Sequence, residues 1–213
     1  LRDLCTTETI DTIINCAAYT AVDAAEKEPE LAQAVNATGV QNLVTVCEER
    51  NIRLLHISTD YVFNGEGSSP YKPNDPVSPL GIYGKTKRAG EEALLQSSIQ
   101  GVILRTSWVY STFGGNFVKT MLRLGAERDT LNVVNDQIGC PTYARDLAHV
   151  CLKLIEADWS VADRIYHFSN TGAITWFDFA TEIMRLSGLH CKVQPIPSSE
   201  FPTPAKRPGY SVL

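Results

Sequence analysis

Tyr83 and Lys87 lie four residues apart in the segment 82–87, which reads IYGKTK. On a helix this spacing is about one turn, so both side chains would stand on the same face. An ammonium near a phenol lowers the pKa of the phenol from its ordinary value of about 10. A tyrosine held in this way can give a proton to a carbonyl oxygen near neutral pH. The spacing also occurs by chance in many helices, so the elements around the pair must decide its meaning.

A second set of polar residues follows a predicted strand over 53–57, whose apolar content includes Leu54 and Leu55. The next three residues are Ser58, Thr59 and Asp60. Ligands of open α/β sheets bind beyond the carboxyl ends of the strands, so these side chains lie where a site is expected. The alternative interpretation is that they only cap a turn.

The predicted elements alternate between strands and helices along most of the chain. Apolar residues at helical spacing predict helices over 30–50, 83–96, 116–123, 144–157 and 175–186. Short apolar runs predict strands over 11–16, 53–57, 102–106, 130–134, 164–168 and 193–196. A strand, a helix and a strand at normal crossover length indicate a parallel sheet, so the fold class is α/β.

Other segments near the predicted strand ends allow two interpretations each. Small residues at 17–18 would let a flat ligand approach the backbone, or would pack tightly against a helix. Trp108 and Tyr110 follow the strand over 102–106 and could form a ligand wall or belong to the core. The long, proline-containing loop 64–81 is typical of a functional loop.

The C-terminal part of the chain differs in composition from the rest. It is rich in proline from Pro195 onward, which predicts an extended segment lying over a surface. Lys206 and Arg207 are adjacent cations in this segment. They could bind a phosphate group or could simply be a solvated basic pair.

The bulk composition excludes several classes of function. The 213 residues are 44% hydrophobic and 20% charged, with a net charge of −5, which is typical of a globular protein without a nucleic-acid partner. No apolar run reaches the roughly 20 residues of a membrane span. The six cysteines and four histidines are scattered without the spacing of metal ligands, so we expect no metal site. Scattered cysteines and no visible signal peptide favour the cytoplasm.

The order Thr59, Tyr83, Lys87 on successive elements resembles the catalytic set of the short-chain dehydrogenase/reductase superfamily. Within that superfamily, six blocks in the same chain order resemble the dTDP-4-dehydrorhamnose reductase family. The blocks are 15–26, 58–65, 79–87, 104–110, 135–142 and 207–213. They cover essentially the whole chain.

This resemblance implies a Rossmann-like, doubly wound parallel sheet with a small C-terminal substrate-binding domain. Residues 1–108 and 143–170 would form the remainder of the dinucleotide-binding domain, and 109–142 and 171–213 the substrate-binding part. The implied reaction reduces the 4-keto group of dTDP-4-dehydro-6-deoxy-L-mannose to give dTDP-L-rhamnose. NADPH or NADH would supply the hydride, and the dTDP-sugar would be the partner molecule.

The resemblance also implies roles for individual residues. Tyr83 would protonate the carbonyl oxygen, Lys87 would hold the nicotinamide ribose and lower the pKa of Tyr83, and Thr59 would polarise the carbonyl. Asp60 lies beside Thr59 and completes the implied catalytic set. The implied cofactor-binding residues are Ala17, Ala18, Tyr19, Ser58, Tyr83 and Lys87. The implied substrate-binding residues are Thr20, Val22, Thr59, Trp108, Asn116, Lys206 and Arg207.

The chain departs from the family pattern in two places. No glycine precedes Gly39, so we expect this chain to lack the first strands of the family and the glycine-rich loop that seats the cofactor pyrophosphate. The isolated chain is therefore expected to bind a dinucleotide poorly and to be nearly inactive. In addition, Arg145 stands where some family members carry a metal-binding glutamate at a dimer contact. We therefore expect a monomer or a weak homodimer.

Two other functions remain open at this point. Some reductase-like chains are non-catalytic regulatory subunits, although the presence of Thr59, Tyr83 and Lys87 speaks against that function. A related nucleotide-sugar epimerase or dehydratase is the second alternative. Dehydratases usually place an acidic pair after the catalytic threonine, whereas this chain has Asp60 alone.

Overall fold

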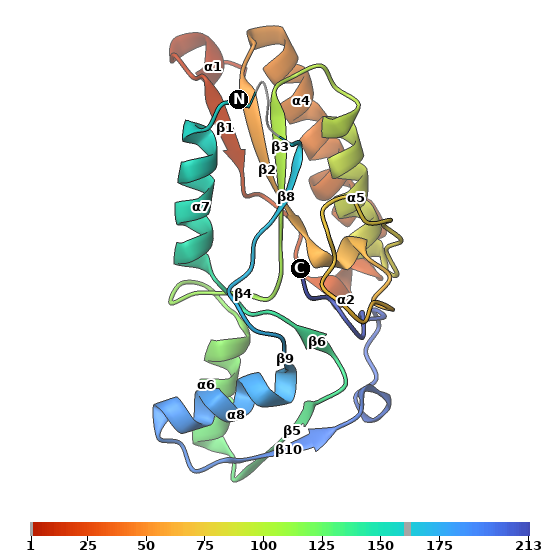
Figure 1. The fold of residues 1–213 in the computed structure, drawn as a ribbon, viewed down its shortest axis with the longest axis vertical. Coiled ribbons are helices and arrows are strands. Elements are labelled where there is room, and N and C mark those ends of the chain that lie inside the picture. The colour runs from red at the N-terminus through yellow and green to blue at the C-terminus, as the bar shows by residue number, and fades with distance from the viewer. Residues whose placement is uncertain (1, 160–162) are drawn as a thin grey trace.

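The computed structural model describes residues 2–159 and 163–213. Within these residues, the main sheet is four-stranded and parallel, in the order β1-β2-β3-β8 (Figure 1). Its strands are β1 (Thr12–Asn15), β2 (Arg53–Thr59), β3 (Gly101–Thr106) and β8 (Ile165–His167). Asn15 pairs with His56 and Thr59 pairs with Thr106, so the chain leaves these strands at one common edge. The predicted parallel α/β sheet is confirmed.

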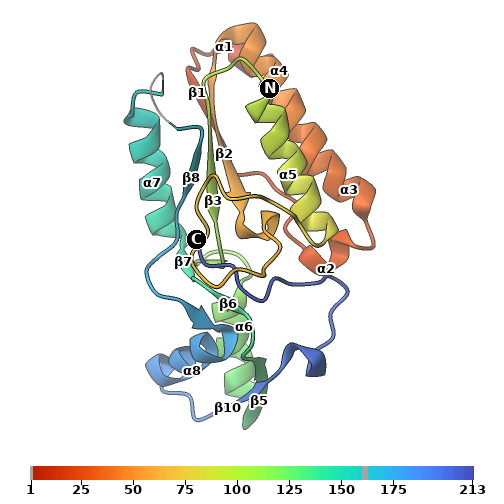
Figure 2. The same cartoon turned by 45° about the vertical axis from the view of Figure 1, so that its right-hand side comes forward.

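Helices cover both faces of the main sheet, as Figure 2 shows. The helices are α1 (Leu4–Thr7), α2 (Val22–Ala25), α3 (Pro29–Gln33), α4 (Gly39–Arg50), α5 (Ile82–Leu95), α6 (Phe117–Glu127), α7 (Ala144–Glu156) and α8 (Trp176–Ser187). Leu54 of β2 packs with Val44 and Leu94, on the face of α4 and α5. The next residue, Leu55, packs with Leu147 and Cys151 of α7 on the opposite face. This alternation follows from the two-residue period of a strand.

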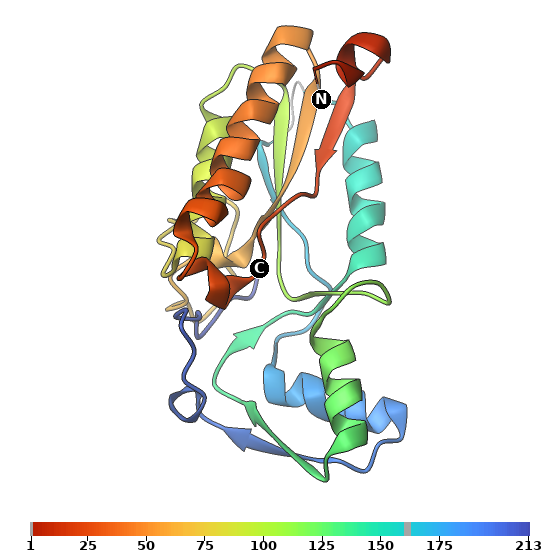
Figure 3. The same cartoon turned by 180° about the vertical axis from the view of Figure 1, so that it is seen from behind.

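A smaller layer lies beyond the edge at which β1, β2 and β3 end (Figure 3). There α6 and α8 pack on a parallel pair formed by β5 (Thr130–Val134) and β10 (Lys192–Ile196). Met121, Leu131 and Ile183 belong to its separate apolar core. Short strands connect it to the main sheet: β4 (Val109–Tyr110), β6 (Ile138–Gly139), β7 (Thr142–Tyr143) and β9 (Ile174–Thr175). The predicted domain boundaries stay a prediction.

The sequence sets several helix ends directly. Thr175 begins α8 through a capping box with Asp178, in which each side chain bonds the other residue's backbone N–H. Gly188 ends the same helix in the left-handed conformation, with φ of 67°. Asn51 ends α4 in the same way, with φ of 55°. Asparagine tolerates this conformation better than most residues with a side chain.

The single helix predicted over 30–50 is wrong in its middle. The run contains α3, a π-helical segment over Ala34–Thr38, and then α4. The π-helical turn carries Asn36, whose fully buried side chain makes its hydrogen bonds outside the helix. Such turns are rare and often lie at functional sites. Helical periodicity alone does not distinguish this turn from a regular helix.

The C-terminal segment returns from the smaller layer to the main sheet. Tyr210 bridges Ile138, and the Val212 carbonyl accepts a hydrogen bond of 2.9 Å from the backbone N–H of Tyr71. The tail is therefore extended over a surface, as predicted. None of the helices in the described part of the chain has the length and apolar character needed to cross a membrane.

Replacing Gly90 by alanine tests the close contact between α5 and the π-helical turn. A Cβ at Gly90 would lie 2.3 Å from the backbone oxygen of Asn36, so the two segments would have to separate. We expect Gly90→Ala to lower the free energy of unfolding by about 1–3 kcal/mol, as overpacking usually does. Chemical denaturation measures this change.

Gly39→Ala is the matched control, because Gly39 is also helical and its Cβ would meet its nearest neighbour at 3.4 Å. Alanine favours a helix over glycine by about 1 kcal/mol, so this control should be neutral or stabilising. Equal stability changes in the two variants would contradict the proposed contact.

Candidate active site

Thr59 is the last residue of β2 and the N-cap of a short 3₁₀ helix over Asp60–Val62. Its hydroxyl accepts a hydrogen bond of 3.2 Å from the backbone N–H of Tyr61 and donates one of 3.0 Å to Asp60 Oδ1. The turn-capping role considered from the sequence is therefore real. The same hydrogen bonds hold the Thr59 hydroxyl at the carboxyl end of the sheet. Thr59 can therefore cap the turn and also belong to the candidate site.

Tyr83 lies in the first turn of α5 and packs edge-on against Tyr61, with ring centroids 5.4 Å apart. Burial raises the pKa of Tyr83 to about 12, and a hydrogen bond with Thr59 opposes this increase. The expectation that the pKa of Tyr83 lies below its ordinary value is therefore wrong. The cost of placing a phenolate in this poorly solvated position outweighs the stabilising interactions.

Lys87 lies one turn further along α5 and is almost fully buried. Its Nζ donates a 2.7 Å hydrogen bond to the Ile57 carbonyl and lies 3.4 Å from His56 Nε2. Burial lowers the pKa of Lys87 to about 8, against the opposing charge of Glu91. The ammonium is thus seated against the end of β2, one helical turn from Tyr83.

The segment after β1 is fixed by Asn36 of the π-helical turn. The Asn36 Oδ1 accepts a 2.8 Å hydrogen bond from the backbone N–H of Tyr19. The Nδ2 group donates to the Tyr19 carbonyl and to Thr86 Oγ1, both at 3.1 Å. One buried amide therefore ties the segment that contains Ala17 and Ala18 to the helix of Tyr83 and Lys87.

The N-terminus of α5 is also held from the segment after β1. Gly81 is its N-cap and makes no side-chain cap. Glu26 instead accepts a 2.8 Å hydrogen bond from the backbone N–H of Ile82 through Oε1. Gly84 has a second role, because a Cβ there would lie 2.2 Å from the Tyr61 carbonyl oxygen. These contacts set where Tyr83 stands relative to Thr59.

The C-terminal segment braces the turn after β2. Ser211 forms a side-chain hydrogen bond with Asp60, which is buried. Burial raises the pKa of Asp60 to about 6, and the hydrogen bonds from Ser211 and Thr59 oppose this increase. Arg207 pairs with Asp23 at 2.7 Å and also contacts the Tyr61 side chain. The basic pair is therefore not simply solvated, since Arg207 is held in an ion pair.

A cleft of about 1370 Å³ opens between the main sheet and the smaller layer. Thr20, Val22 and Arg207, three of the predicted substrate-binding residues, line this cleft together with Tyr61. Because Tyr61 also packs against Tyr83, the cleft ends beside the proposed proton donor. Its volume is large enough for a nucleotide sugar, since pockets for drug-sized ligands reach about 1,000 Å³.

Other predicted site residues lie elsewhere. Trp108 stacks on Trp176 with ring centroids 3.5 Å apart, and Trp176 is the one that lines the cleft. Asn116 caps α6, with its amide donating to the Ser111 carbonyl. Lys206 lines a smaller, neighbouring pocket. Trp108, Asn116 and Lys206 therefore lie behind or beside the cleft and do not line it.

Ser58 is buried on β2, next to Thr59 in the chain. The two-residue period of the strand turns its side chain away from that of Thr59. Its hydroxyl has no hydrogen-bond partner among the described residues, so its role in binding the cofactor stays a prediction.

Sequence reasoning missed Asn36, Glu26 and Glu91. Their signals in the sequence are weak: a polar residue at an otherwise regular helical position, the first glutamate of the charged run 26–28, and one of two adjacent glutamates. Each acts on residues distant in the chain, or is buried by them. Only the arrangement of β1, β2 and α5 makes their roles visible.

Comparison with known proteins adds independent findings. The profile of the family described as RmlD substrate binding domain matches residues 1–213. The chain is 46% identical over 211 residues to dTDP-4-dehydrorhamnose reductase of Salmonella typhimurium, covering 95% of this chain and 71% of that protein. It is 45% identical over 203 residues to the spore coat polysaccharide biosynthesis protein SpsK of Bacillus subtilis, covering 95% and 70%.

Solved structures agree with these sequence relatives. The dTDP-4-dehydrorhamnose reductase of Bacillus anthracis, in complex with NADP, matches with a TM-score of 0.95 and 42% identity, covering 100% of this chain and 74% of that one. The orthologue from Clostridium acetobutylicum matches with a TM-score of 0.94 and 44% identity over the same shares. The doubly wound Rossmann-like architecture is thereby confirmed.

Replacing Asp60 by asparagine tests its raised pKa. A carboxyl whose folded-state pKa exceeds its unfolded value of 3.8 stabilises the fold fully only below that value, and the benefit is lost as pH rises through about 6. We therefore expect Asp60→Asn to be more stable than the parent by about 3 kcal/mol at pH 7.5 and by roughly half that at pH 5. Urea denaturation at both pH values measures the difference.

Asp11→Asn provides the control, because Asp11 is exposed just before β1. It should show no such pH-dependent gain. If the difference between Asp60→Asn and the parent is the same at both pH values, Asp60 does not carry a raised pKa.

Proposed function

Because the chain belongs to the RmlD substrate binding domain family, we propose that it reduces the 4-keto group of dTDP-4-dehydro-6-deoxy-L-mannose. The product is dTDP-L-rhamnose, and NADPH is the reductant. The observation that carries this proposal is the placement of Thr59, Tyr83 and Lys87 at one edge of the sheet, beside the large cleft.

The residues at the sheet edge fit a nicotinamide cofactor. Ala17 and Ala18 leave β1 with small side chains, and Ala17 is exposed, so a flat ring can approach the backbone there. Lys87 uses one hydrogen bond on the Ile57 carbonyl, which leaves donors for the ribose hydroxyls. When bound, NADPH supplies the hydride that adds to the carbonyl carbon.

The side chains of this chain supply the proton and the hydrogen bonds. Tyr83 gives its phenolic proton to the carbonyl oxygen as negative charge develops there. The Thr59 hydroxyl, which donates to Asp60 Oδ1 in the structure, turns its proton toward the same oxygen. The Lys87 ammonium stabilises the phenolate that Tyr83 leaves behind, until the proton is replaced from solvent.

The cleft supports the identity of the substrate. It is lined by Thr20 and Val22 on the sheet side and by Trp176 on the side of the smaller layer. Arg207, one of the two cations predicted to bind phosphate, lines the cleft. It would reach a diphosphate only in competition with Asp23, its partner at 2.7 Å.

We further propose that the protein acts in the cytoplasm as a monomer or weak homodimer. The support is the exposed Arg145 on α7, at a position where a metal-bridged dimer of this family would need a carboxylate.

Tyr83→Phe tests the proton donor. Loss of a general acid typically lowers the rate by about 10²–10⁴-fold, so we expect a fall of that size in kcat. The measurement is NADPH oxidation by the full-length protein with the 4-keto sugar nucleotide. Tyr166→Phe, on β8, is the control and should keep the parent rate. Full activity of Tyr83→Phe would remove Tyr83 from the mechanism, and no turnover by the parent would favour a non-catalytic regulatory role.

The pH profile tests the role of the Lys87 charge. Reduction needs Tyr83 protonated, which holds up to about pH 12, and Lys87 protonated, which holds up to about pH 8. We therefore expect kcat/KM to fall as pH rises through about 8. Lys87→Arg should retain activity at higher pH, because a guanidinium stays charged. A parent profile that remains flat to about pH 9.5 would contradict the role of this charge.

A further inference from the structure

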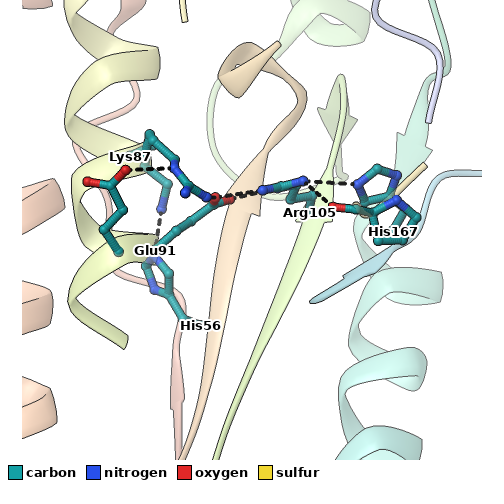
Figure 4. A network of polar contacts seen from close by, with 8 residues as sticks. His56, Lys87, Glu91, Arg105 and His167 are labelled. Carbon is teal, nitrogen blue, oxygen red and sulfur yellow. Dashed lines mark hydrogen bonds and ion pairs between the residues drawn. The ribbon is translucent and has the colours of Figure 1, made fainter. Parts of the chain in front are cut away.

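Glu91 lies one turn after Lys87 on α5 and has no solvent exposure. Its carboxylate receives two parallel hydrogen bonds from Arg105 of β3, from Nε to Oε1 and from Nη2 to Oε2, both at 2.8 Å. Arg88 donates a third, of 3.0 Å, to Oε2. Figure 4 shows this polar network running from His56 and Lys87 across to Arg105 and His167.

The carboxylate of Glu91 is held in its ionised form. Burial favours the neutral acid, but the hydrogen bonds and charge of Arg105, with smaller contributions from Ser58 and Arg88, lower the pKa of Glu91 overall. A bidentate arginine–carboxylate pair is the strongest common geometry for holding such a charge. The site therefore contains a carboxylate that stays negatively charged, one helical turn from Lys87 on α5.

The other groups that face Lys87 carry no negative charge near neutral pH. His56 faces it from β2, and burial together with the Lys87 charge places the pKa of His56 well below its usual value. Cys16 faces it from the segment after β1, and burial raises the pKa of that thiol. Arg105 contributes positive charge from β3. Among the described groups around Lys87, Glu91 makes the largest contribution in favour of the charged ammonium, and Cys16 makes a smaller one.

We propose that Glu91 is a positioning residue for the reduction: its buried carboxylate, fixed by Arg105, keeps the Lys87 ammonium charged and seated against the end of β2. Glu91 touches neither the carbonyl nor the proton donor in this arrangement, and acts through Lys87. The inference rests on the proposed function only for its effect on catalysis.

Arg105 links this charge to the loop over the site. Its Nη1 donates a 3.1 Å hydrogen bond to the Pro73 carbonyl and lies 3.5 Å from His167 Nε2. His167 Nδ1 is in turn 3.1 Å from the Tyr71 carbonyl. Arg105, which pairs with Glu91, therefore also anchors the loop 64–81. The position of this loop and the position of the Lys87 ammonium both depend on Arg105.

Glu91→Gln in the full-length protein tests this proposal. The substitution keeps the side-chain shape and removes the charge that opposes loss of the Lys87 proton. The readout is the carbon-13 signal of the Lys87 side chain in lysine-labelled protein, followed through a pH titration and assigned with Lys87→Arg. We expect its midpoint to fall by about one pH unit, as removal of a close opposite charge typically causes. The alkaline limb of kcat/KM should move by the same amount.

Glu92→Gln is the matched control. Glu92 is the adjacent carboxylate and also pairs with Arg88, at 3.0 Å, but its side chain is 49% exposed. The Lys87 midpoint should not move in this variant. A role of Glu91 in stability alone would lower the melting temperature and leave the midpoint unchanged, which would overturn the proposal.

Arg88→Gln covers the case in which Glu91→Gln does not fold. Arg88 reaches Glu91 from the rim of the helix, so its removal leaves the buried pair with Arg105 in place. The Glu91 charge is then less neutralised, and the Lys87 midpoint should rise, opposite to the effect of Glu91→Gln. An unmoved midpoint overturns the proposal. A moved midpoint in a protein without turnover would support the role of Glu91 and reject the proposed reaction instead.

Discussion

The Lys87 ammonium lies buried between α5 and β2, and the polar groups around it are arranged to offset the cost of burying that charge. The penalty for an ion in a protein interior is several kcal/mol even after relaxation. The Ile57 carbonyl, at the end of β2, accepts one of its N–H groups, and the Glu91 carboxylate opposes its positive charge. Glu91 is then itself a buried charge, and it requires Arg105.

This dependence joins elements that are far apart in the sequence. The Glu91–Arg105 pair connects α5 to β3, and Arg105 continues to the loop 64–81 and to β8. Replacing such a pair with apolar residues is often neutral or stabilising, whereas removing one partner costs about 3–5 kcal/mol. The pair is therefore poorly explained as a source of stability alone. The need to hold a charged lysine at the sheet edge gives a physical reason for the Glu91–Arg105 pair.

A second set of contacts holds the other half of the site. The turn after β2 is braced from the C-terminal segment, through Ser211 to Asp60 and through Arg207 to Tyr61. Asn36 and Glu26 hold the segment after β1 against α5. Thr59, Tyr83 and Lys87 are thus placed by residues from both ends of the chain. Short local motifs alone would not fix their mutual geometry.

Much of the fold was predictable from the sequence because the strands and most helices have clear periodicity. The Tyr83–Lys87 spacing and the polar residues after β2 also placed the three candidate groups at one sheet edge. The π-helical turn was not predictable, since Asn36 acts through Tyr19 and Thr86 rather than through its own helix. The pKa of Tyr83 was predicted in the wrong direction, because burial depends on packing that spacing does not reveal.

The shifts in these two pKa values fit the starting state of the proposed reduction. Burial raises the pKa of Tyr83 to about 12, so at neutral pH the phenol keeps the proton that carbonyl reduction consumes. Oxidation of an alcohol would first require the phenolate, at a cost of about 1.4 kcal/mol for each unit between the pH and that pKa. Burial lowers the pKa of Lys87 only to about 8, so most of its positive charge remains at neutral pH, where it would stabilise the phenolate that the proposed reaction leaves on Tyr83. A poorly solvated edge of the sheet therefore keeps Tyr83, the proposed proton donor, protonated, and in our proposal the ionised Glu91 keeps the Lys87 ammonium charged.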